Sequence, residues 1–259
     1  MNNVRTVSDT KRAFYSQHTR PINAIYRRVV EELMVEAHLL LVNADFNYDS
    51  IYALGVVSTY DRFMQGYEPA GDRDNIYRAI LQANEADPDQ YRRDAEELIG
   101  VAKSLPSIDS FKSVLDQAKT ASGSDTLQAN LHKAISNPKF KYSRLFAIGL
   151  YNVIEAIDAE LLNDKDKRDA LMTEVATTIE LNEDLLKKDI DLYRGNLEKM
   201  AQAQEVMKDM IEADKKKKAK REEEKKKRAE AKAAAEKAKA TETTETTETT
   251  EAPSTNEAE

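Results

Sequence analysis

The sequence contains no cysteine, and histidine is nearly as scarce, with three residues in 259. The lack of cysteine excludes a disulfide framework, a thiolate zinc site, an iron–sulfur cluster and a thiol nucleophile. His18, His38 and His132 lie far apart, and none has a second potential ligand three or four residues away. We therefore expect no metal site. His38 lies beside an apolar stripe and is predicted to be a partly buried, hydrogen-bonded core residue.

Glycine and proline are also few, with seven and six residues. That is too few for a sheet-rich fold with many tight turns, and alternating apolar–polar runs bounded by turn residues are absent. Residues that favour helices, namely alanine, leucine, glutamate, lysine and arginine, dominate instead. The sequence therefore predicts an all-α fold, a multi-helix bundle.

No apolar run is long enough to span a membrane. The longest nearly apolar stretch covers residues 145–154 and is interrupted by Asn152, whereas a spanning helix needs about 20 residues. The first residues, MNNVRTVSDTKRAF, lack the apolar core of a secretory signal and are too short for an organelle transit peptide. We expect a soluble protein that is made where it works.

Capping residues and helix breakers divide the chain into helices. Residues 142–162 are apolar on most sides, which places that helix at the centre of the bundle, and residues 65–74, with two glycines and a proline, are the clearest loop. Helices are predicted over the ranges Ser8 to about His18, Pro21 to Leu41, Ile51 to Met64, Asp125 to Ser136, Tyr142 to Leu162 and Asn163 to about Leu181. Four further helices are predicted to start at Asp74, Asp87 and Ser107 and after Asn182.

The segment after Asn182 has a heptad pattern. Its seam positions step by four and three over nearly four heptads, which is typical of a coiled coil. An amphipathic helix that docks on the body would show the same pattern, and both interpretations stay open. The seam consists of Leu186, Ile190, Tyr193, Leu197, Met200, Gln204, Met207 and Ile211.

Charge is unevenly distributed along the chain, although the net value is −8. The first 214 residues are acidic, with 26 basic and 36 acidic side chains, whereas residues 215–239 carry 13 basic and 5 acidic ones. Because an acidic body does not suit a phosphate backbone, we expect no nucleic-acid partner. The predicted parts are a helical bundle over 1–181, a long amphipathic or coiled-coil helix over 182–213, a charged solvated helix over 214–239 and a disordered acidic tail over 240–259.

A basic tract lies within the charged helix. It is a candidate for contact with anionic lipid headgroups, where each cation near the surface contributes about 1 kcal/mol. A solvated helix whose charges pair with one another is the alternative. The tract comprises Lys215, Lys216, Lys217, Lys218, Lys225, Lys226, Lys227 and Arg228.

Motifs for enzymatic chemistry are missing from the sequence. It contains no Gly-Lys-Ser/Thr phosphate loop, no Gly-x-Gly-x-x-Gly turn, no Gly-x-Ser-x-Gly elbow and no Glu-x-x-His pair of a di-iron bundle. Glu155 and Asp158 lie one helical turn apart, as an acid–base pair would require, but a solvent-facing surface is the simpler interpretation. We therefore expect no enzymatic activity and no cofactor.

Eight of the eleven tyrosines lie within residues 1–91, interleaved with arginines. Tyrosine and arginine are enriched at the anchors of protein–protein interfaces, which favours a partner-binding surface. The same tyrosines would also fit a bundle core with their hydroxyls at its edge, and both interpretations stay open. Tyr60, Arg62 and Tyr67, around the predicted loop, are the candidate partner-binding residues.

Two long strings, in the right order, resemble the thylakoid formation proteins of cyanobacteria and plastids, also described as photosystem II biogenesis proteins. They are TVSDTKRAFYSQHTRPINAIYRRVVEELMVEAHLLLVNADFNYDSIYALGVVSTYDRFMQGYEP and KKDIDLYRGNLEKMAQA. The resemblance covers about residues 1–213, and the charged tail from Asp214 lies outside it. The lack of a transit peptide points to a cyanobacterial member.

The resemblance implies a helical, non-enzymatic factor for photosynthetic membrane biogenesis and photosystem II repair, peripheral on the cytoplasmic side of the thylakoid membrane. It also implies that the protein binds and supports the FtsH-type membrane protease complexes that remove damaged reaction-centre subunits. It brings no catalytic or agreed binding residues. The alternative is a peripheral membrane-surface organiser that binds anionic lipid through the basic tract. The oligomeric state is left open.

Overall fold

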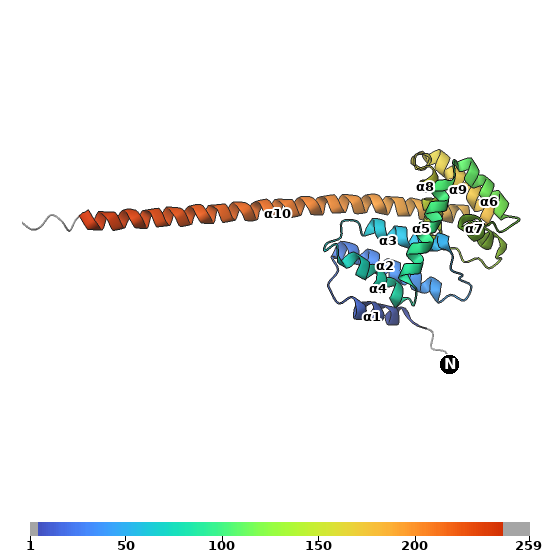
Figure 1. Cartoon of the computed structure of the whole chain (residues 1–259), viewed down its shortest axis with the longest axis horizontal. Helices are drawn as coiled ribbons and strands as arrows, with labels where there is room; N and C mark the ends of the chain where they lie inside the picture. Colours follow the sequence, from blue (N-terminus) through green and yellow to red (C-terminus); the bar gives the residue numbers. More distant parts are fainter. Residues whose placement is uncertain (1–4, 246–259) are drawn as a thin grey trace, which may run out of the picture. The chain divides into compact units, whose positions relative to one another are not determined.

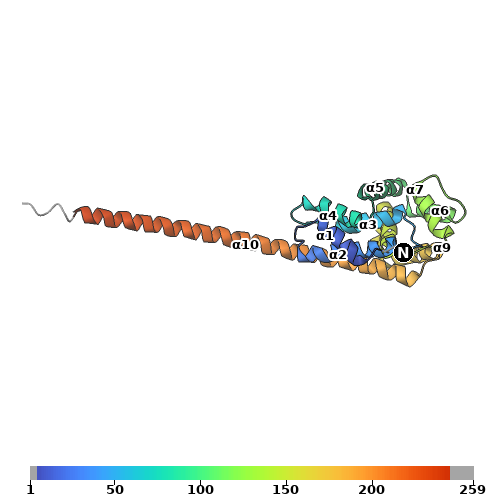
Figure 2. The ribbon, with the colours of Figure 1, turned by 90° about the horizontal axis from the view of Figure 1, so that it is seen from below.

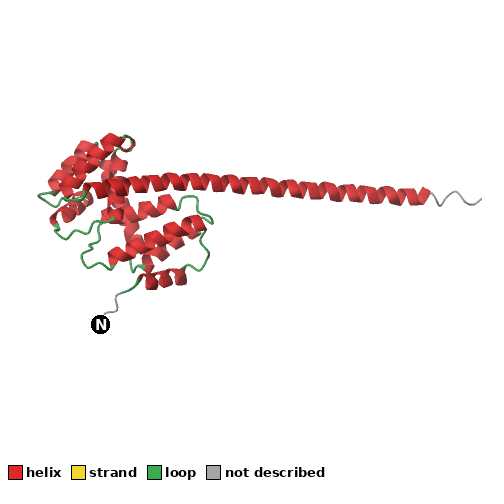
Figure 3. Ribbon diagram, turned by 180° about the vertical axis from the view of Figure 1, so that it is seen from behind, coloured by secondary structure: helices red, strands yellow, loops and turns green. Residues whose placement is uncertain are grey.

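The computed structural model describes the backbone of residues 5–245 and the side chains of residues 5–231. Every regular element in that part of the chain is a helix (Figure 3). This confirms the predicted all-α fold with a long C-terminal helix. The elements, shown in Figure 1, are α1 (Val7–Gln17), α2 (Ala24–Leu41), α3 (Ser50–Phe63), α4 (Asp72–Ala83), α5 (Pro88–Ser104), α6 (Ile108–Ala118), α7 (Thr126–Ser136), α8 (Arg144–Ile157), the 3-10 helix η1 (Leu161–Asn163), α9 (Lys165–Ile179) and α10 (Glu183–Glu245).

The described residues fall into two compact units, which divide after Ala203. The first unit, called the body below, holds α1 to α9 and the beginning of α10. Helices α3, α5 and α8 pack on one another at its centre. Helices α1, α2 and α4 pack together at one end of the body, and α6, α7 and α9 at the other (Figures 1 and 2). No helix in the described part of the chain has the length and apolarity needed to cross a membrane.

The N-terminal ends of α1 and α2 differ from the predicted ones. Thr6, not Ser8, caps α1, because its hydroxyl accepts the backbone N–H of Asp9 at 3.2 Å while the Asp9 carboxylate accepts the backbone N–H of Thr6 at 3.1 Å. Two otherwise unpaired backbone donors are thereby satisfied in one capping box. The cap of α2 is Asn23, so Pro21 precedes the helix and does not form its first turn.

The central helix α8 is shorter than the predicted segment 142–162. It starts after Ser143, whose hydroxyl accepts the Phe146 N–H at 3.0 Å, and it stops at Asp158, whose backbone is extended. The Asp158 carboxylate then accepts the Leu161 N–H at 3.0 Å, which begins the separate turn η1. Its placement at the centre is confirmed, since every residue from 145 to 154 is buried. Helix α4 begins at Asp72, two residues before the predicted start.

Two glycines allow α3 and α8 to cross at very short range. A Cβ atom on Gly55 would lie 1.8 Å from the carbonyl oxygen of Leu145, and one on Gly149 would lie 1.8 Å from the carbonyl oxygen of Ile51. The backbones of the two helices are therefore in direct contact at this crossing. Neither position has room for any side chain.

The beginning of α10 docks on the body. Its seam residues Leu186, Ile190 and Tyr193 are buried, and Tyr142 donates a hydrogen bond to Asp189 at 2.7 Å. The Asn182 cap predicted for this helix is confirmed, because its side chain accepts a backbone N–H of the first turn. The docking interpretation of the seam therefore holds for this part of the helix.

The described part of the second unit, residues 204–245, continues α10 as one helix. Ile211, the last seam residue, is 48% exposed. The helix includes residues 240–245, which the composition had assigned to the disordered tail, and the rest of that predicted tail, 246–259, lies outside the described residues. The four predicted parts and their boundaries stay predictions.

Candidate functional site

Two of the three candidate partner-binding residues lie in the core. Tyr60 is 1% exposed and donates a hydrogen bond to the carbonyl oxygen of Arg73 at 2.5 Å. Tyr67 is 2% exposed, and its ring meets that of Tyr26 edge to face at 5.1 Å. These side chains offer almost no surface to a partner, because other residues of the bundle cover them. For both residues the core interpretation of the tyrosines holds, and their contact with a partner stays a prediction.

The third candidate, Arg62, forms an ion pair with Glu155. Both side chains are half-buried, and the pair connects α3 to α8. Glu155 therefore does not belong to an open solvent face, and it is not paired with Asp158, whose carboxylate binds the backbone of the following turn. The ion pair gives Arg62 a structural role, while its contact with a partner stays a prediction.

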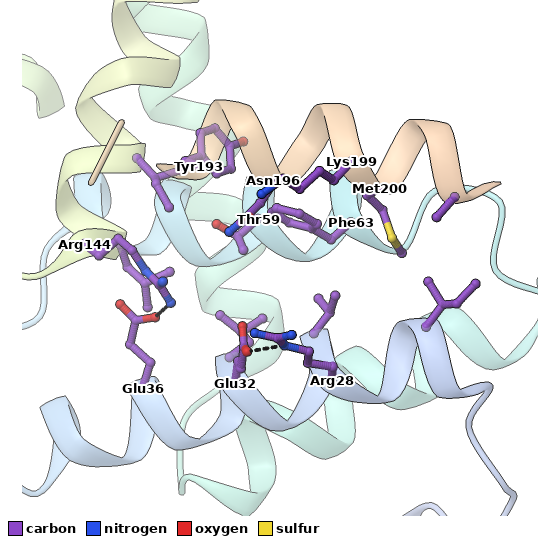
Figure 4. A pocket seen from close by; sticks show the side chains of 16 residues that line it. Arg28, Glu32, Glu36, Thr59, Phe63, Arg144, Tyr193, Asn196, Lys199 and Met200 are labelled. Carbon is purple, nitrogen blue, oxygen red and sulfur yellow. Dashed lines mark hydrogen bonds and ion pairs between the residues drawn. The ribbon is translucent and has the colours of Figure 1, made fainter. Parts of the chain in front are cut away.

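A groove lies between α2 and the docked part of α10, with α3 and α8 forming its floor. Its cavity volume is about 390 Å³, which falls within the range of small-molecule sites. Figure 4 shows α2 on one side and α10 on the other, with side chains from both pointing into the space. We call it the α2–α10 groove. It is lined by Ile25, Arg28, Val29, Glu32, Leu33, Glu36, Thr59, Phe63, Arg144, Leu145, Ile148, Tyr193, Asn196, Lys199, Met200 and Ala203.

The two acids in the α2–α10 groove are both neutralised. Glu32 accepts from Arg28 at 2.7 Å, one turn away on the same helix, and Glu36 is paired with Arg144 from α8 (Figure 4). Burial raises the pKa of Glu36, and the hydrogen bond from Arg144 opposes that shift. The Arg144–Glu36 pair is half-buried, so it holds α8 against α2 at one end of the groove.

Three other polar groups in the α2–α10 groove have no protein partner among the described side chains. The Thr59 hydroxyl is buried without a hydrogen bond, and neither the Asn196 amide nor the Lys199 ammonium is paired within residues 5–231. Asn196 and Lys199 lie three residues apart on one face of α10. Figure 4 shows both side chains on α10, where Asn196 is half-buried and Lys199 is exposed. The groove therefore combines an apolar floor with unsatisfied donors.

A second, shallower groove lies on the outer face of α2 and has a cavity volume of about 670 Å³. Leu39, which is 57% exposed, lines it, and so does Glu31. Tyr15 from α1 donates a hydrogen bond to Glu31 at 3.2 Å and is itself exposed. Val42, one turn beyond Leu39, is exposed as well. Leu39 and Val42 form what we call the outer patch.

The basic tract lies in the second unit, on α10. All eight of its cations are exposed. Lys227 is paired with Glu223 at 2.7 Å, a helical i,i+4 contact. Such exposed pairs contribute only a few tenths of a kcal/mol, so the tract keeps most of its positive charge available.

His38 has the structural role that the sequence predicts. His38 is buried, and its Nδ1 lies 2.9 Å from the Thr10 hydroxyl, which confirms the predicted hydrogen-bonded core residue. Within the described residues, no three histidine or acidic side chains come together as a metal site. The α2–α10 groove was missed by sequence reasoning, since its residues come from helices far apart in the chain. The seam on α10 was the one available signal for the groove, because Tyr193 and Met200 belong to it.

Comparison with known proteins extends the resemblance to nearly the whole chain. The family model described as thylakoid formation protein matches residues 6–224, which reaches into the basic tract and beyond the limit of about 213 drawn from the sequence strings. Protein Thf1 of Trichormus variabilis is 55% identical over 221 residues, which are 85% of this chain and 94% of that protein. Protein Thf1 of Nostoc punctiforme shows the same identity and coverage.

A solved structure has the same fold. The structure of Psb29 at 1.55 Å superposes with a TM-score of 0.72 and 40% sequence identity, and the match covers 83% of this chain and 99% of that one. The family is named for thylakoid formation and not for a reaction. From the match over residues 6–224 and the relatives with 55% identity, the chain belongs to the thylakoid formation protein family.

Proposed function

We propose that the protein is a non-enzymatic factor for photosynthetic membrane biogenesis and photosystem II repair, and that it binds and supports FtsH-type membrane protease complexes. The observation that carries the proposal is its family membership over nearly the full length of its relatives. The protein works at the thylakoid membrane as a peripheral component on the cytoplasmic side. The protease as partner comes from the family resemblance of the two sequence strings.

Two features of the body support a binding role. The outer patch exposes two large apolar side chains, Leu39 in the shallow groove and Val42 one turn further along the chain, and exposed apolar side chains grouped in this way mark interaction surfaces. The groove is also lined by charged side chains, including Lys11, Glu31 and Lys141. An apolar centre with a polar rim is the usual anatomy of a protein interface. The outer patch replaces Tyr60 and Tyr67 as the expected contact surface.

The cellular role is tested by deleting the gene and following photosystem II activity after strong light. The proposal expects lower abundance of the FtsH-type protease and slower recovery of photosystem II, and both should return with the wild-type gene. Unchanged protease abundance and unchanged recovery in the deletion strain would contradict it.

The contact surface is tested with Leu39→Asp, which places a charge in the outer patch without touching the core. Leu185→Asp is the matched control, because Leu185 is also an exposed leucine of the body but lies on α10. We expect Leu39→Asp to lose protease capture and Leu185→Asp to keep it, with both variants folding as the wild type by circular dichroism. Equal capture by the two variants would remove the outer patch from the contact.

A second candidate function is direct organisation of the membrane surface through the basic tract. The exposure of all eight cations on one helix favours it, since cations near an anionic surface each add about 1 kcal/mol of attraction. Flotation with anionic liposomes tests it, because electrostatic attachment must weaken as salt rises. Binding that persists in a 1–213 truncation would place any lipid contact in the body instead.

A further inference from the structure

The α2–α10 groove is apolar at one end and carries an ion pair at the other. Its floor and far end are apolar, with Leu33, Phe63, Ile148 and Met200 facing the cavity. Figure 4 shows Phe63 and Met200 toward one end of the groove and the Arg144–Glu36 ion pair at the other. An occupant that removes this apolar surface from water gains about 25 cal/mol for each Å² it covers. The occupant must therefore have an apolar part.

The charge left over in the groove is positive. Each of the two acids has its own arginine, as Arg28–Glu32 and Arg144–Glu36. Of the five charged residues that line the cavity, only Lys199 has no ion pair within the described side chains. An anionic group on the occupant would supply the missing partner, and charge-assisted hydrogen bonds are about twice as strong as neutral ones.

Two neutral donors accompany the ammonium. The Thr59 hydroxyl is buried without a partner on α3, and the Asn196 amide faces the cavity from α10. A buried polar group left unpaired costs roughly 1–3 kcal/mol. Only the Thr59 hydroxyl bears this cost, because Asn196 is half-buried and Lys199 is exposed. An oxygen-rich head that accepts from all three groups would remove it. A carboxylate or a phosphate has this geometry, whereas a cationic or purely apolar ligand does not.

The length of the groove fits one aliphatic chain. Its lining residues extend from Ile25 to Glu36 on α2 and from Tyr193 to Ala203 on α10, so at 1.5 Å per residue each wall is about 15 Å long. The hydrocarbon core of a bilayer is about 30 Å thick, so one leaflet, which is one acyl chain deep, is about 15 Å thick. An acyl chain is therefore about as long as the groove. The cavity volume of about 390 Å³ suits a single chain of this length.

We propose that the α2–α10 groove binds a free single-chain amphiphilic anion. Its carboxylate or phosphate is held by Lys199, Asn196 and Thr59, and its aliphatic chain lies over Phe63 and Ile148. The protein is thus a carrier or sensor of such a molecule, in addition to the binding role proposed above and independent of it.

Titration calorimetry of the full-length protein with decanoate, below its critical micelle concentration, tests the proposal. Decanol provides the same chain with a neutral head. We expect decanoate to bind with one-to-one stoichiometry and more tightly than decanol. Absence of decanoate binding, or equal affinity for the two probes, would overturn the proposal.

Matched variants locate the site. Lys199→Met keeps the length of the side chain and removes the charge, and Lys188→Met is the control, because Lys188 is an exposed lysine of α10 that does not line the groove. We expect Lys199→Met to weaken decanoate about tenfold and to leave decanol unchanged, since a charge-assisted contact is worth about that factor. Lys188→Met should change neither affinity. Equal effects of the two substitutions would contradict the assigned head-group site.

Two further measurements locate the aliphatic chain and distinguish a free anion from a membrane headgroup. Val29→Trp narrows the groove at its partly exposed wall and should abolish decanoate uptake while the far-ultraviolet circular dichroism stays the same. Vesicles of phosphatidylcholine and phosphatidylglycerol test a membrane headgroup as the source of the anion. Flotation with these vesicles should be the same for wild type and Lys199→Met. If the wild type did not bind decanoate and Lys199→Met abolished flotation, the ligand would be a membrane headgroup, and the free anion would be refuted.

Discussion

Replacing Gly149 with alanine should force the two central helices apart. The new Cβ would lie 1.8 Å from the Ile51 carbonyl oxygen and 2.7 Å from its carbon, and both are backbone atoms that no rotamer change can move. Overpacking in a core costs 1–3 kcal/mol when side chains are able to adjust. Here a whole helix must shift and lose packing along the crossing, so we expect a loss of about 3 kcal/mol or more in the free energy of unfolding.

Gly100→Ala is the matched control, because a Cβ atom at Gly100, within α5, would meet nothing within 4 Å. Alanine there should stabilise the helix by about 0.5–1 kcal/mol. Urea unfolding followed by tyrosine fluorescence measures both, and it reports on the body alone, since all eleven tyrosines lie at or before Tyr193. A Gly149→Ala variant as stable as the wild type would refute the backbone contact between α3 and α8.

Four further substitutions test the buried carboxylate, a core tyrosine and the docked seam. Burial raises the pKa of Asp49 from 3.8 to about 6, so the folded state holds this proton more tightly than the unfolded chain, and the stability it contributes at low pH is lost as pH rises through about 6. Asp49→Asn still caps α3 but does not titrate. Its free energy of unfolding relative to that of the wild type should therefore rise by roughly 3 kcal/mol between acid and neutral pH in urea titrations. A difference between variant and wild type that stays constant with pH would contradict the raised pKa of Asp49. Tyr60→Phe removes one hydrogen bond and should cost about 1 kcal/mol while protease capture is unchanged, whereas lost capture would restore Tyr60 as a contact. Ile190→Ala should cost about 2–5 kcal/mol and Ile211→Ala less than about 0.5, and equal costs would argue against docking of the seam at Ile190.

Local signals in the sequence predicted most of the helices. Periodic apolar residues and short polar caps fix where a helix forms, so Asn182 was identified correctly from neighbouring residues alone. His38 was predicted correctly for the same reason, since its place beside an apolar stripe determines its burial. The cap of α1 was missed because Thr6 and Ser8 are chemically alike, and only the reciprocal bond with Asp9 selects Thr6.

Sequence reasoning failed where burial depends on distant helices. Tyr60 and Tyr67 have an apolar ring and a polar tip, which suits both a core and an interface, and their exposure is set by the helices that cover them. The three donors of the α2–α10 groove have no local signature either. Thr59 is an ordinary residue of α3, and it lines the groove only because α10 docks on the body.

The proposed function requires that the helical body binds an FtsH-type membrane protease complex. Capture from mildly solubilised thylakoid membranes, with the tagged full-length protein, a 1–213 truncation and the Leu39→Asp variant, tests it most directly when read by mass spectrometry. We expect FtsH subunits to be recovered with the full-length protein and with the truncation but not with Leu39→Asp. Recovery by none of the three would contradict direct binding, and recovery by the full-length protein alone would place the contact beyond the body.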